Sequence, residues 1–477
     1  MKKAELMFIP FPAVGHIVSM VEIAKLLTHR YPHLSATVLI IHTPFPSMAD
    51  SYIKSVSAAS TGHGGIKFLN LPPPQQTPDD PPAYKSFDAI VSPSIPNVRA
   101  AVAELSASPD SAPVAGFVVD MLCTLMMDLA KELGLPSYVF FPSGAAVLGL
   151  VLHFQTLRDD HHRDITELVN SDAELIIPGF ANPVPASVLP FAGVDKDGGT
   201  TAFLNSAKRF RESKGILVNT CVELESYPIN TLNTNITDGT PPIYPVGPIL
   251  NLTDGAQKGS SIMSWLDDQP PSSIVFLCFG SMGSFNVNQV REIALGLELS
   301  GHRFLWSLRR SPPSTVKNKI VFPTDYDNPE EVLPEGFLER TAGIGKVIGW
   351  APQVAVLAHR AVGGFVSHCG WNSILESMWY GVPIATWPMY AEQQLNAFAM
   401  VRELGLGVEI RIDYKKDSGD LVSANEIEKG IRRVMEGDGE VIRKNVKEMR
   451  EKIRKAPTRD GSSYISLGQF IEQVMCD

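Results

Sequence analysis

Two residues suited to acid–base chemistry follow separate strands in the first 120 residues. His16 comes shortly after a predicted strand over Leu6–Ile9, and Asp120 ends a predicted strand over Val114–Val119. In a doubly wound sheet these strands can be neighbours, which would bring both side chains to one sheet edge. A carboxylate on one imidazole nitrogen stabilises the imidazolium that forms when the other nitrogen takes a proton from a hydroxyl. The alternative is a histidine satisfied by its local backbone and an aspartate that caps a helix beginning near Leu122.

A second group of polar residues lies between a predicted strand over Val362–Ser367 and a helix. The run Ser-His-Cys-Gly-Trp-Asn-Ser delivers His368, Asn372 and Ser373 to the N-terminus of that helix. Free N–H groups and the helix dipole attract a diphosphate there. Imidazole, amide and hydroxyl groups can all donate to phosphate oxygens without a metal. Alternatively, Asn372 or Ser373 only caps the helix, and the residues alone leave both explanations open.

Three further features of this stretch suit a nucleotide and a sugar. Glu376 lies in the first turns of the helix, where a carboxylate can take paired ribose hydroxyls or simply compensate the helix dipole. Trp350 follows a strand that ends at Ile348 and offers a flat ring for a base, although an isolated tryptophan is more often core. Glu392 and Gln393 follow a strand and supply acceptors and amide donors for sugar hydroxyls; alone, they would be an ordinary solvated loop.

The joint spacing of these residues is far more specific than any one of them. The segment from Trp350 to Gln393 resembles the PSPG box, the signature of plant family 1 UDP-glycosyltransferases. It matches in length and order: an initial WAPQ, a central HCGWNS, a glutamate after it and a closing acidic–Gln pair. The resemblance extends to FPAVGH at the N-terminus, to CFGSMGS around Ser281 and to the overall length. Within the family, the sequence looks most similar to members that act on flavonoids, other phenolics and terpenoids.

The resemblance implies a role for each matching residue. Trp350 would stack on uracil, with the region of Ala351 and Gln353 bonding the edge of the base, and Glu376 would take the ribose hydroxyls. A glutamine at the last box position is associated with glucose, and a histidine there with galactose. The implied diphosphate contacts are His368, Asn372, Ser373 and Ser281, and the implied sugar contacts are Trp371, Glu392 and Gln393.

The resemblance also implies a fold and a reaction. The fold would be α/β of the GT-B type, with two Rossmann-like doubly wound domains facing a central cleft. The enzyme would transfer glucose from UDP-glucose to a hydroxyl of a small lipophilic acceptor, without a cofactor or a metal. His16 would be the catalytic base and Asp120 its partner, and the anomeric configuration would invert.

The elements that must position these residues alternate in both halves of the chain. Short β-branched or aromatic runs alternate with amphipathic stretches, which predicts parallel, doubly wound sheets. In the first half we expect a helix over about Val18–Thr28 and further strands over Ala36–Ile41, Ser137–Phe141, Gly215–Asn219 and Ile243–Val246. In the second half we expect strands over Ser273–Phe279, Arg303–Trp306, Val347–Ile348 and Pro383–Ala385, and helices over Gln289–Leu299, Ala424–Met435 and Val441–Arg454.

A segment rich in Gly, Asn, Asp and Ser separates the two halves. We therefore expect an acceptor-binding domain at 1–247, a linker at 248–261 and a UDP-sugar-binding domain at 262–456. In the last stretch, 457–477, an amphipathic helix over Tyr464–Met475 is expected to dock back on the first domain. Ligands of such sheets bind outside the carboxyl ends of the strands, where the candidate residues fall.

The acceptor pocket is expected around His16. Ser143 follows a strand of the first half, and Ala391 would lie opposite in the second half. For any single apolar residue near them, core packing is the more common role. The apolar candidates for the pocket are Phe11, Val14, Phe87, Met121, Phe141 and Leu148.

Composition excludes several partners. A net charge of −10 argues against nucleic acid and anionic membranes, which need a basic face. The chain has no run of about 20 uninterrupted apolar residues that would predict a membrane span. Five cysteines without metal-ligand spacing fit a reducing compartment, so we expect a cytoplasmic monomer. The run from Asp195 to Asp197 matches a metal-binding DxD motif, but it stands in a Gly-rich loop without a suitable strand before it.

Three other functions have weaker support. A UDP-sugar epimerase needs no organic acceptor, which the apolar residues around His16 argue against. A catalytically inactive nucleotide-sugar-binding protein would have no need of both His16 and Asp120. A dehydrogenase is disfavoured because no GxGxxG follows any predicted strand.

Overall fold

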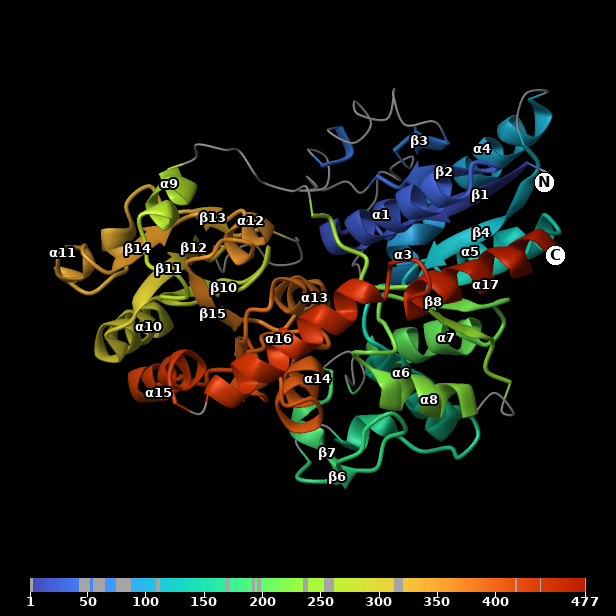
Figure 1. Ribbon diagram of the computed structural model, residues 1–477. Helices are drawn as coiled ribbons and strands as arrows, with labels where there is room; N and C mark the ends of the chain where they lie inside the picture. Colours follow the sequence, from blue (N-terminus) through green and yellow to red (C-terminus); the bar gives the residue numbers. More distant parts are fainter. Residues whose placement is uncertain are drawn as a thin grey trace, which may run out of the picture.

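Two parallel β-sheets, one in each half of the chain, organise the structure (Figure 1). The computed structural model describes residues 3–42, 52–54, 65–73, 87–108, 112–168, 171–190, 194, 199–234, 239–252, 261–312, 321–416, 418–437 and 439–476. Helices cover both faces of each sheet, which is the two-domain, doubly wound arrangement that the sequence predicts. Over these ranges, no helix combines the length and the apolar character needed to cross a membrane.

The first sheet has seven strands in the order β3-β2-β1-β4-β5-β8-β9, all parallel. The central strand β1 (Ala4–Ile9) is buried along its whole length and pairs with both β2 and β4. The pairing of β1 with β4 confirms that the strand before His16 and the strand that ends in Asp120 are neighbours. The other strands are β2 (Leu34–Ile40), β3 (Ile66–Asn70), β4 (Val114–Asp120), β5 (Ser137–Phe141), β8 (Ile216–Val218) and β9 (Ile243–Pro245).

The helix after β1 begins earlier than the sequence predicts. We expected it from about Val18, but α1 spans Val14–Arg30, so His16 lies in its first turn. The first N–H groups of a helix need no acceptor within the helix, so Gly15 and His16 are tolerated there despite their weak helix propensity. The remaining helices of this half are α3 (Phe87–Val91), α4 (Ile95–Ala107), α5 (Met126–Glu132), α6 (Ala145–Asp159), α7 (Gly199–Phe210) and α8 (Ser226–Thr234).

The second sheet has six parallel strands in the order β14-β11-β10-β15-β16-β17. Its strands are β10 (Ile274–Cys278), β11 (Arg303–Ser307), β14 (Gly345–Ile348), β15 (Val362–Ser367), β16 (Ile384–Thr386) and β17 (Gly407–Glu409). Its helices are α9 (Ser261–Asp267), α10 (Val287–Ser300), α11 (Phe337–Thr341), α12 (Gln353–Leu357), α13 (Trp371–Tyr380), α14 (Gln393–Phe398), α15 (Ala424–Met435) and α16 (Gly439–Lys455).

Both domains also contain short strands and single helical turns outside the two main sheets. Two antiparallel pairs join β6 (Glu174–Leu175) to β7 (Val184–Pro185) and β12 (Arg309–Arg310) to β13 (Thr324–Asp325). A π-helix over Ala399–Glu403 continues α14. The 3₁₀ turns are Ser92–Ser94, Ile165–Leu168, Ala186–Val188 and Pro329–Glu331.

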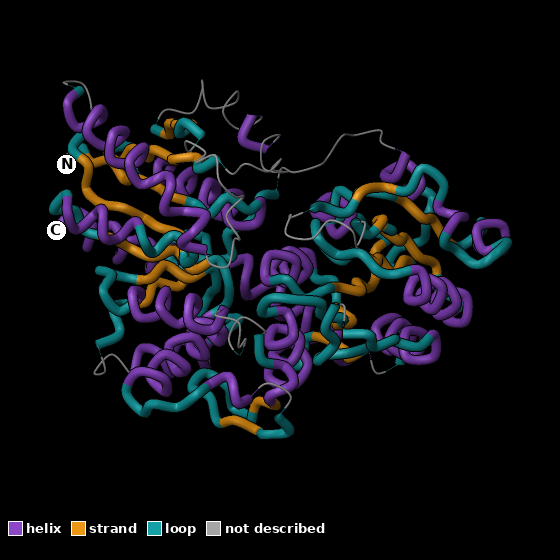
Figure 2. Tube along the Cα trace, turned by 180° about the vertical axis from the view of Figure 1, so that it is seen from behind, coloured by secondary structure: helices purple, strands orange, loops and turns teal. Residues whose placement is uncertain are grey.

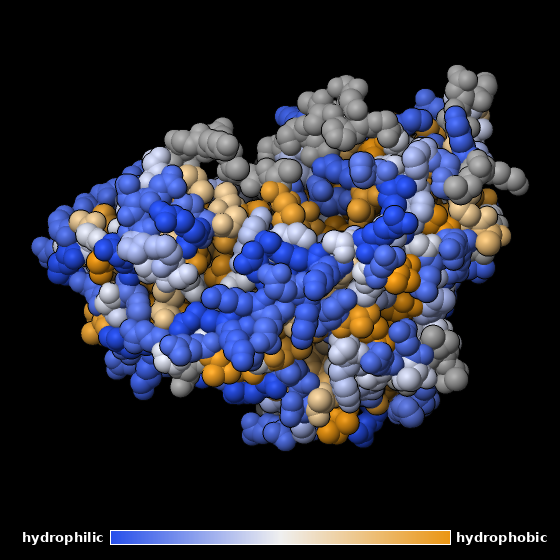
Figure 3. All heavy atoms as spheres, viewed as in Figure 1, coloured by the Kyte–Doolittle hydropathy of each residue, from blue (hydrophilic) through white to orange (hydrophobic). Residues whose placement is uncertain are grey.

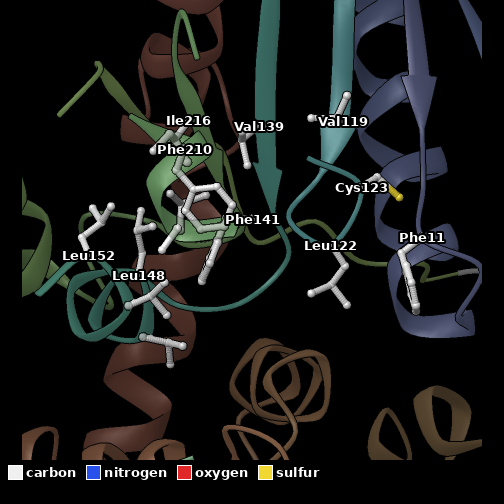
Figure 4. Packing of buried hydrophobic residues seen from close by; sticks show 14 of the residues in the cluster. Phe11, Val119, Leu122, Cys123, Val139, Phe141, Leu148, Leu152, Phe210 and Ile216 are labelled. Atoms are coloured by element: carbon white, nitrogen blue, oxygen red, sulfur yellow. The ribbon is translucent and has the colours of Figure 1, made fainter. Parts of the chain in front are cut away.

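Some of the residues that we expected to line the acceptor pocket belong to the hydrophobic core of the first domain. Phe141 and Leu148 are fully buried, and Phe11 is 9% exposed. Figure 4 shows them with Val139, Phe210 and other apolar side chains between the sheet and its helices. For these three residues, core packing is the role that the structure supports.

The last helix, α17 (Ser462–Cys476), returns to the first domain and lies near the N-terminus of the chain (Figures 1 and 2). Phe470 is fully buried, and its ring packs edge-on against Tyr138 at 5.1 Å and against Tyr244 at 5.7 Å between ring centroids. The guanidinium of Arg30 lies over the ring of Tyr464. The chain therefore enters and leaves the second domain beside the first sheet.

Helix α16 presents a hydrophilic surface in the middle of the face seen in Figure 3.

Candidate active site

His16 and Asp120 meet at the carboxyl edge of the first sheet. Nδ1 of His16 lies 2.8 Å from Oδ2 of Asp120, whose side chain is fully buried. The other carboxylate oxygen accepts the backbone N–H of Leu122 at 2.9 Å. Asp120 therefore performs both roles that the sequence left open, since it stabilises the turn before α5 and also orients the imidazole.

The environment of His16 favours its protonated form. Burial acts to lower the pKa of His16, but the charge of Asp120, the hydrogen bond to Asp120 and the charge of Glu392 together raise it. Because Nδ1 faces Asp120, Nε2 is the nitrogen left to accept a proton. The ring of Phe11 packs edge-on against the imidazole at 5.7 Å and restricts its rotation.

Two cavities adjoin His16. A cavity of about 550 Å³ is lined mainly by the second domain, and one of about 410 Å³ lies beside His16 between the two domains. Residues that line both are Gly15, His368, Asn372 and Ser373. The two cavities therefore meet at the N-termini of α1 and α13, one from each domain.

The sequence-predicted residues line one or both of these cavities. The larger cavity is lined by Ser281, Trp350, Ala351, Gln353, His368, Asn372, Ser373 and Glu376, the residues that the resemblance assigns to the nucleotide. The smaller cavity is lined by His16, Ser143, Trp371, Ala391, Glu392 and Gln393, together with Phe87 and Met121. Val14, expected beside the acceptor, lines the larger cavity instead, because it opens α1 on the side that faces α13.

A hydrogen-bonded contact holds α1 and α13 together. Nδ2 of Asn372 donates to the carbonyl oxygen of Gly15 at 3.3 Å, and the hydroxyl of Ser19 donates to Oδ1 of Asn372 at 3.4 Å. Trp371 adds a second link, since its indole N–H donates to the carbonyl oxygen of Asn219 at 2.7 Å. These bonds fix the distance between His16 and the N-terminus of α13.

His368 is held as a neutral imidazole. Burial lowers its pKa to about 4. A side-chain carbon added at Gly280 or Gly370 would lie 2.6 or 2.7 Å from Nε2, so glycine is required at both positions. Nδ1 has no hydrogen-bond partner among the residues that the structure describes. A neutral imidazole in this place can donate one N–H to a phosphate oxygen without adding a charge to the site.

Gln353 aligns the polar side chains at the wall of the larger cavity. Its amide nitrogen donates to the hydroxyl of Ser373 at 2.8 Å and to Oε2 of Glu376 at 2.7 Å. The resemblance assigned Gln353 to the edge of the base, whereas here its amide is directed to α13. Gln353 therefore fixes the carboxylate of Glu376 in the orientation in which it faces the cavity.

Two residues expected to hold a sugar use part of their polar groups within the protein. The side-chain oxygen of Gln393 accepts the N–H groups of Met389 and Tyr390 at 2.9 and 3.0 Å, because the turn before α14 offers them no backbone acceptor. The indole N–H of Trp371 is bonded to Asn219, as described above. Gln393 therefore has only its amide nitrogen to offer a ligand, and Trp371 offers the face of its ring.

The sequence did not identify Arg309. Its side chain is 9% exposed, lines the larger cavity and is paired with Asp325 at 2.9 Å. The guanidinium carbon lies 5.1 Å from the centre of the Trp350 ring, which is 49% exposed. Arg309 stands in a polar stretch without a motif, and only the pairing of β12 with β13 brings Asp325 to it. The cation supports Trp350 from the protein side.

The part of the chain that the structure describes holds no preformed metal site. Over the described ranges, no group of three or more His, Cys, Asp or Glu side chains converges as metal ligands would. The DxD run from Asp195 to Asp197 lies outside these ranges.

Known proteins share both the sequence and the fold of this chain. Residues 253–455 match the family model described as UDP-glucoronosyl and UDP-glucosyl transferase. UDP-glucose flavonoid 3-O-glucosyltransferase 6 of Fragaria ananassa is 56% identical over 99% of both chains. A UGT transferase of Siraitia grosvenorii, solved in complex with UDP, is 48% identical with a TM-score of 0.87 and covers 99% of this chain and 100% of its own.

A further solved structure is that of Medicago truncatula UGT71G1 complexed with UDP-glucose. It is 44% identical with a TM-score of 0.86, over 99% of this chain and 98% of its own. These similarities extend over both domains. The chain therefore belongs to the plant family 1 UDP-glycosyltransferases, with their GT-B fold, and is a glycosyltransferase of small plant metabolites.

Proposed function

We propose that this enzyme transfers glucose from UDP-glucose to a hydroxyl of a small phenolic acceptor, with inversion at the anomeric carbon. The observation that carries the proposal is the 2.8 Å contact between His16 and the buried Asp120, located where the two cavities meet. A base at that junction stands between a nucleotide sugar in the larger cavity and an acceptor in the smaller one. The larger cavity would hold UDP, and the sugar would reach towards His16.

The proposed reaction is a single in-line displacement. Nε2 of His16 takes the proton of the acceptor hydroxyl, and the acceptor oxygen forms a bond to C1 of the sugar. The bond between C1 and the β-phosphate oxygen breaks, and UDP leaves with the electron pair. The N–H of His368, the hydroxyl of Ser281 and the N-terminus of α13 would stabilise the charge that develops on the diphosphate. Attack opposite the leaving group would convert an α-linked donor into a β-glucoside.

The lining of the smaller cavity supports a lipophilic acceptor. Its apolar members are Phe87, Met121, Leu122, Pro142, Val147, Pro190 and Phe203. A volume of about 410 Å³ lies within the range of pockets for small organic ligands. The Fragaria relative is named as a flavonoid glucosyltransferase. A flat phenol therefore suits this cavity, with its hydroxyl directed to His16.

The proposed reaction needs no metal. Glu376 is the sole carboxylate among the described residues that line the larger cavity, and the side-chain amide of Gln353 donates a hydrogen bond to it. The other polar members of this lining include hydroxyl, amide and imidazole groups that can donate hydrogen bonds, and Arg309 carries a positive charge. Neutral donors and a helix terminus can hold a diphosphate directly.

The proposed function is tested by offering the purified enzyme phenolic and terpenoid alcohols with UDP-glucose or UDP-galactose. We expect glucosides of phenols, identified by mass, with the β configuration by NMR and with the same rate in EDTA. An α-glucoside would contradict inversion, and a rate lost in EDTA and restored by a divalent cation would contradict a metal-independent site. Conversion of UDP-glucose to another UDP-sugar without an acceptor would indicate an epimerase instead. UDP-glucose binding without turnover of any acceptor would indicate an inactive binding protein.

Replacing Trp350 with alanine is expected to weaken UDP binding by roughly 5- to 150-fold, the effect of losing one base-stacking ring. The ring is half-exposed in the larger cavity and supported by Arg309, so it presents a fixed surface to the base. Trp350→Phe should retain most of the affinity. Calorimetric titration with UDP measures both variants, and an unchanged Kd for Trp350→Ala would exclude stacking on this residue.

A further inference from the structure

The lining of the larger cavity offers a diphosphate little positive charge. Among the described residues that line the larger cavity, Arg309 is the one basic side chain that is charged, because burial keeps His368 neutral. Arg309 is paired with Asp325 and lies against Trp350, at the end where the base would bind. A diphosphate beside His368 and Ser281 would thus contact neutral donors, although it carries at least two negative charges.

A second cation, Lys416, contacts the loop that carries Ser281. Nζ of Lys416 lies 3.2 Å from the carbonyl oxygen of Met282 and 3.2 Å from the hydroxyl of Ser284. Both residues belong to the loop between β10 and α10, which also carries Ser281. Lys416 follows β17 in the chain. This strand lies at one edge of the second sheet, separated from β10 by β15 and β16. The ammonium group of Lys416 therefore spans the gap between two segments distant in sequence.

The backbone of Lys416 contacts the other half of the donor site. Its N–H donates to the carbonyl oxygen of Met389 at 2.8 Å, and the N–H of Met389 is bonded to the side chain of Gln393. Gln394 strengthens the same contact by donating to the carbonyl oxygen of Tyr414 at 2.8 Å. One residue thus connects the loop of Ser281 with the turn of Gln393.

We propose that Lys416 is a positioning residue for the nucleotide sugar. It holds the Ser281 loop and the Gln393 turn in fixed relation, and its charge favours the diphosphate before and after transfer. The inference rests on the proposed function for the identity of the donor. A cation that acts through a loop should affect ligands with a diphosphate and spare ligands without one.

The test compares Lys416→Met with Lys415→Met, its sequence neighbour, and with Lys416→Arg, which keeps the charge. For Lys416→Met we expect a roughly tenfold weaker affinity for UDP, a similar rise in KM for UDP-glucose and a smaller change in kcat. The affinity of uridine, measured by competition, should change by less than about twofold. The UDP affinity of Lys416→Met should also depend less on salt. Lys416→Arg should recover most of the loss, and Lys415→Met should behave as the parent enzyme.

Several results would overturn the inference. An unchanged Kd for UDP in Lys416→Met would do so, as would equal losses for UDP and uridine, which indicate general damage to the domain. If Lys416→Met does not fold, Lys416→Arg is compared with Ser281→Ala instead. Because Lys416→Arg keeps the charge, a loss of UDP affinity as large as that of Ser281→Ala would contradict a role of the charge. Because UDP binding is measured without an acceptor, these outcomes are independent of whether a phenol is glucosylated.

Discussion

Replacing His16 with alanine is expected to reduce glucosyl transfer to an aliphatic alcohol by about 10²- to 10⁴-fold, the usual contribution of a positioned general base. An alcohol at neutral pH keeps its proton, and a neutral oxygen attacks an anomeric carbon poorly. Among the described residues that line the smaller cavity, the only other imidazole is that of His368, whose pKa is lowered to about 4. Steady-state kinetics with a saturating alcohol and UDP-glucose measure the loss in kcat.

The same substitution should leave UDP binding nearly unchanged. His16 lines the smaller cavity and not the larger one, so its removal leaves the nucleotide contacts in place. His153→Ala is the matched control, since this histidine of α6 lies in the same domain and lines neither cavity. Acidic phenols, which ionise unaided, should retain more activity than alcohols in His16→Ala. Full turnover of an alcohol by this variant would reject His16 as the base.

The sequence predicted the contact between His16 and Asp120 because its geometry follows from strand order. His16 follows β1 and Asp120 ends β4, and Ile9 of β1 pairs with Val119 of β4 in the sheet. A long-range contact between residues 104 positions apart therefore depends on a single choice, the adjacency of two parallel strands. The box from Trp350 to Gln393 was predictable for another reason, since its fixed spacing resembles a family signature even though the structure divides it among α12, β15, α13, β16 and the start of α14.

Other features depend on contacts that no local pattern encodes. The strands β3 and β17 were missed because IKFLN is only partly buried and GVE has three residues. Lys416 reaches Met282 across 134 residues, and Arg309 finds Asp325 only through a two-residue ladder. Spacing also says nothing about the direction of a polar group. The resemblance assigned Trp371 and Gln393 to the sugar, but it did not reveal that the protein itself uses the indole N–H and the amide oxygen.

Replacing Asp120 with asparagine is expected to reduce kcat by about 100-fold or more and to move the acidic limb of its pH profile to lower pH. The imidazole must be neutral to accept a proton, so activity falls as the pH drops below the pKa of His16. The charge of Asp120 and its hydrogen bond raise that pKa. Removing the charge lowers the pKa, so a larger fraction of His16 stays neutral in acid. Each neutral imidazole is nevertheless a weaker base, so the plateau of the profile falls.

The tautomer adds to the loss in Asp120→Asn. An asparagine amide can donate to Nδ1 of His16, which would place the ring proton on Nε2, the nitrogen that must accept it. The fold should persist, because the amide oxygen can still accept the N–H of Leu122 as Oδ1 of Asp120 does. Asp128→Asn, an exposed substitution on α5 in the same domain, serves as the control. If the acidic limb of Asp120→Asn stayed in place while its melting temperature matched that of the control, then Asp120 would not set the basicity of His16.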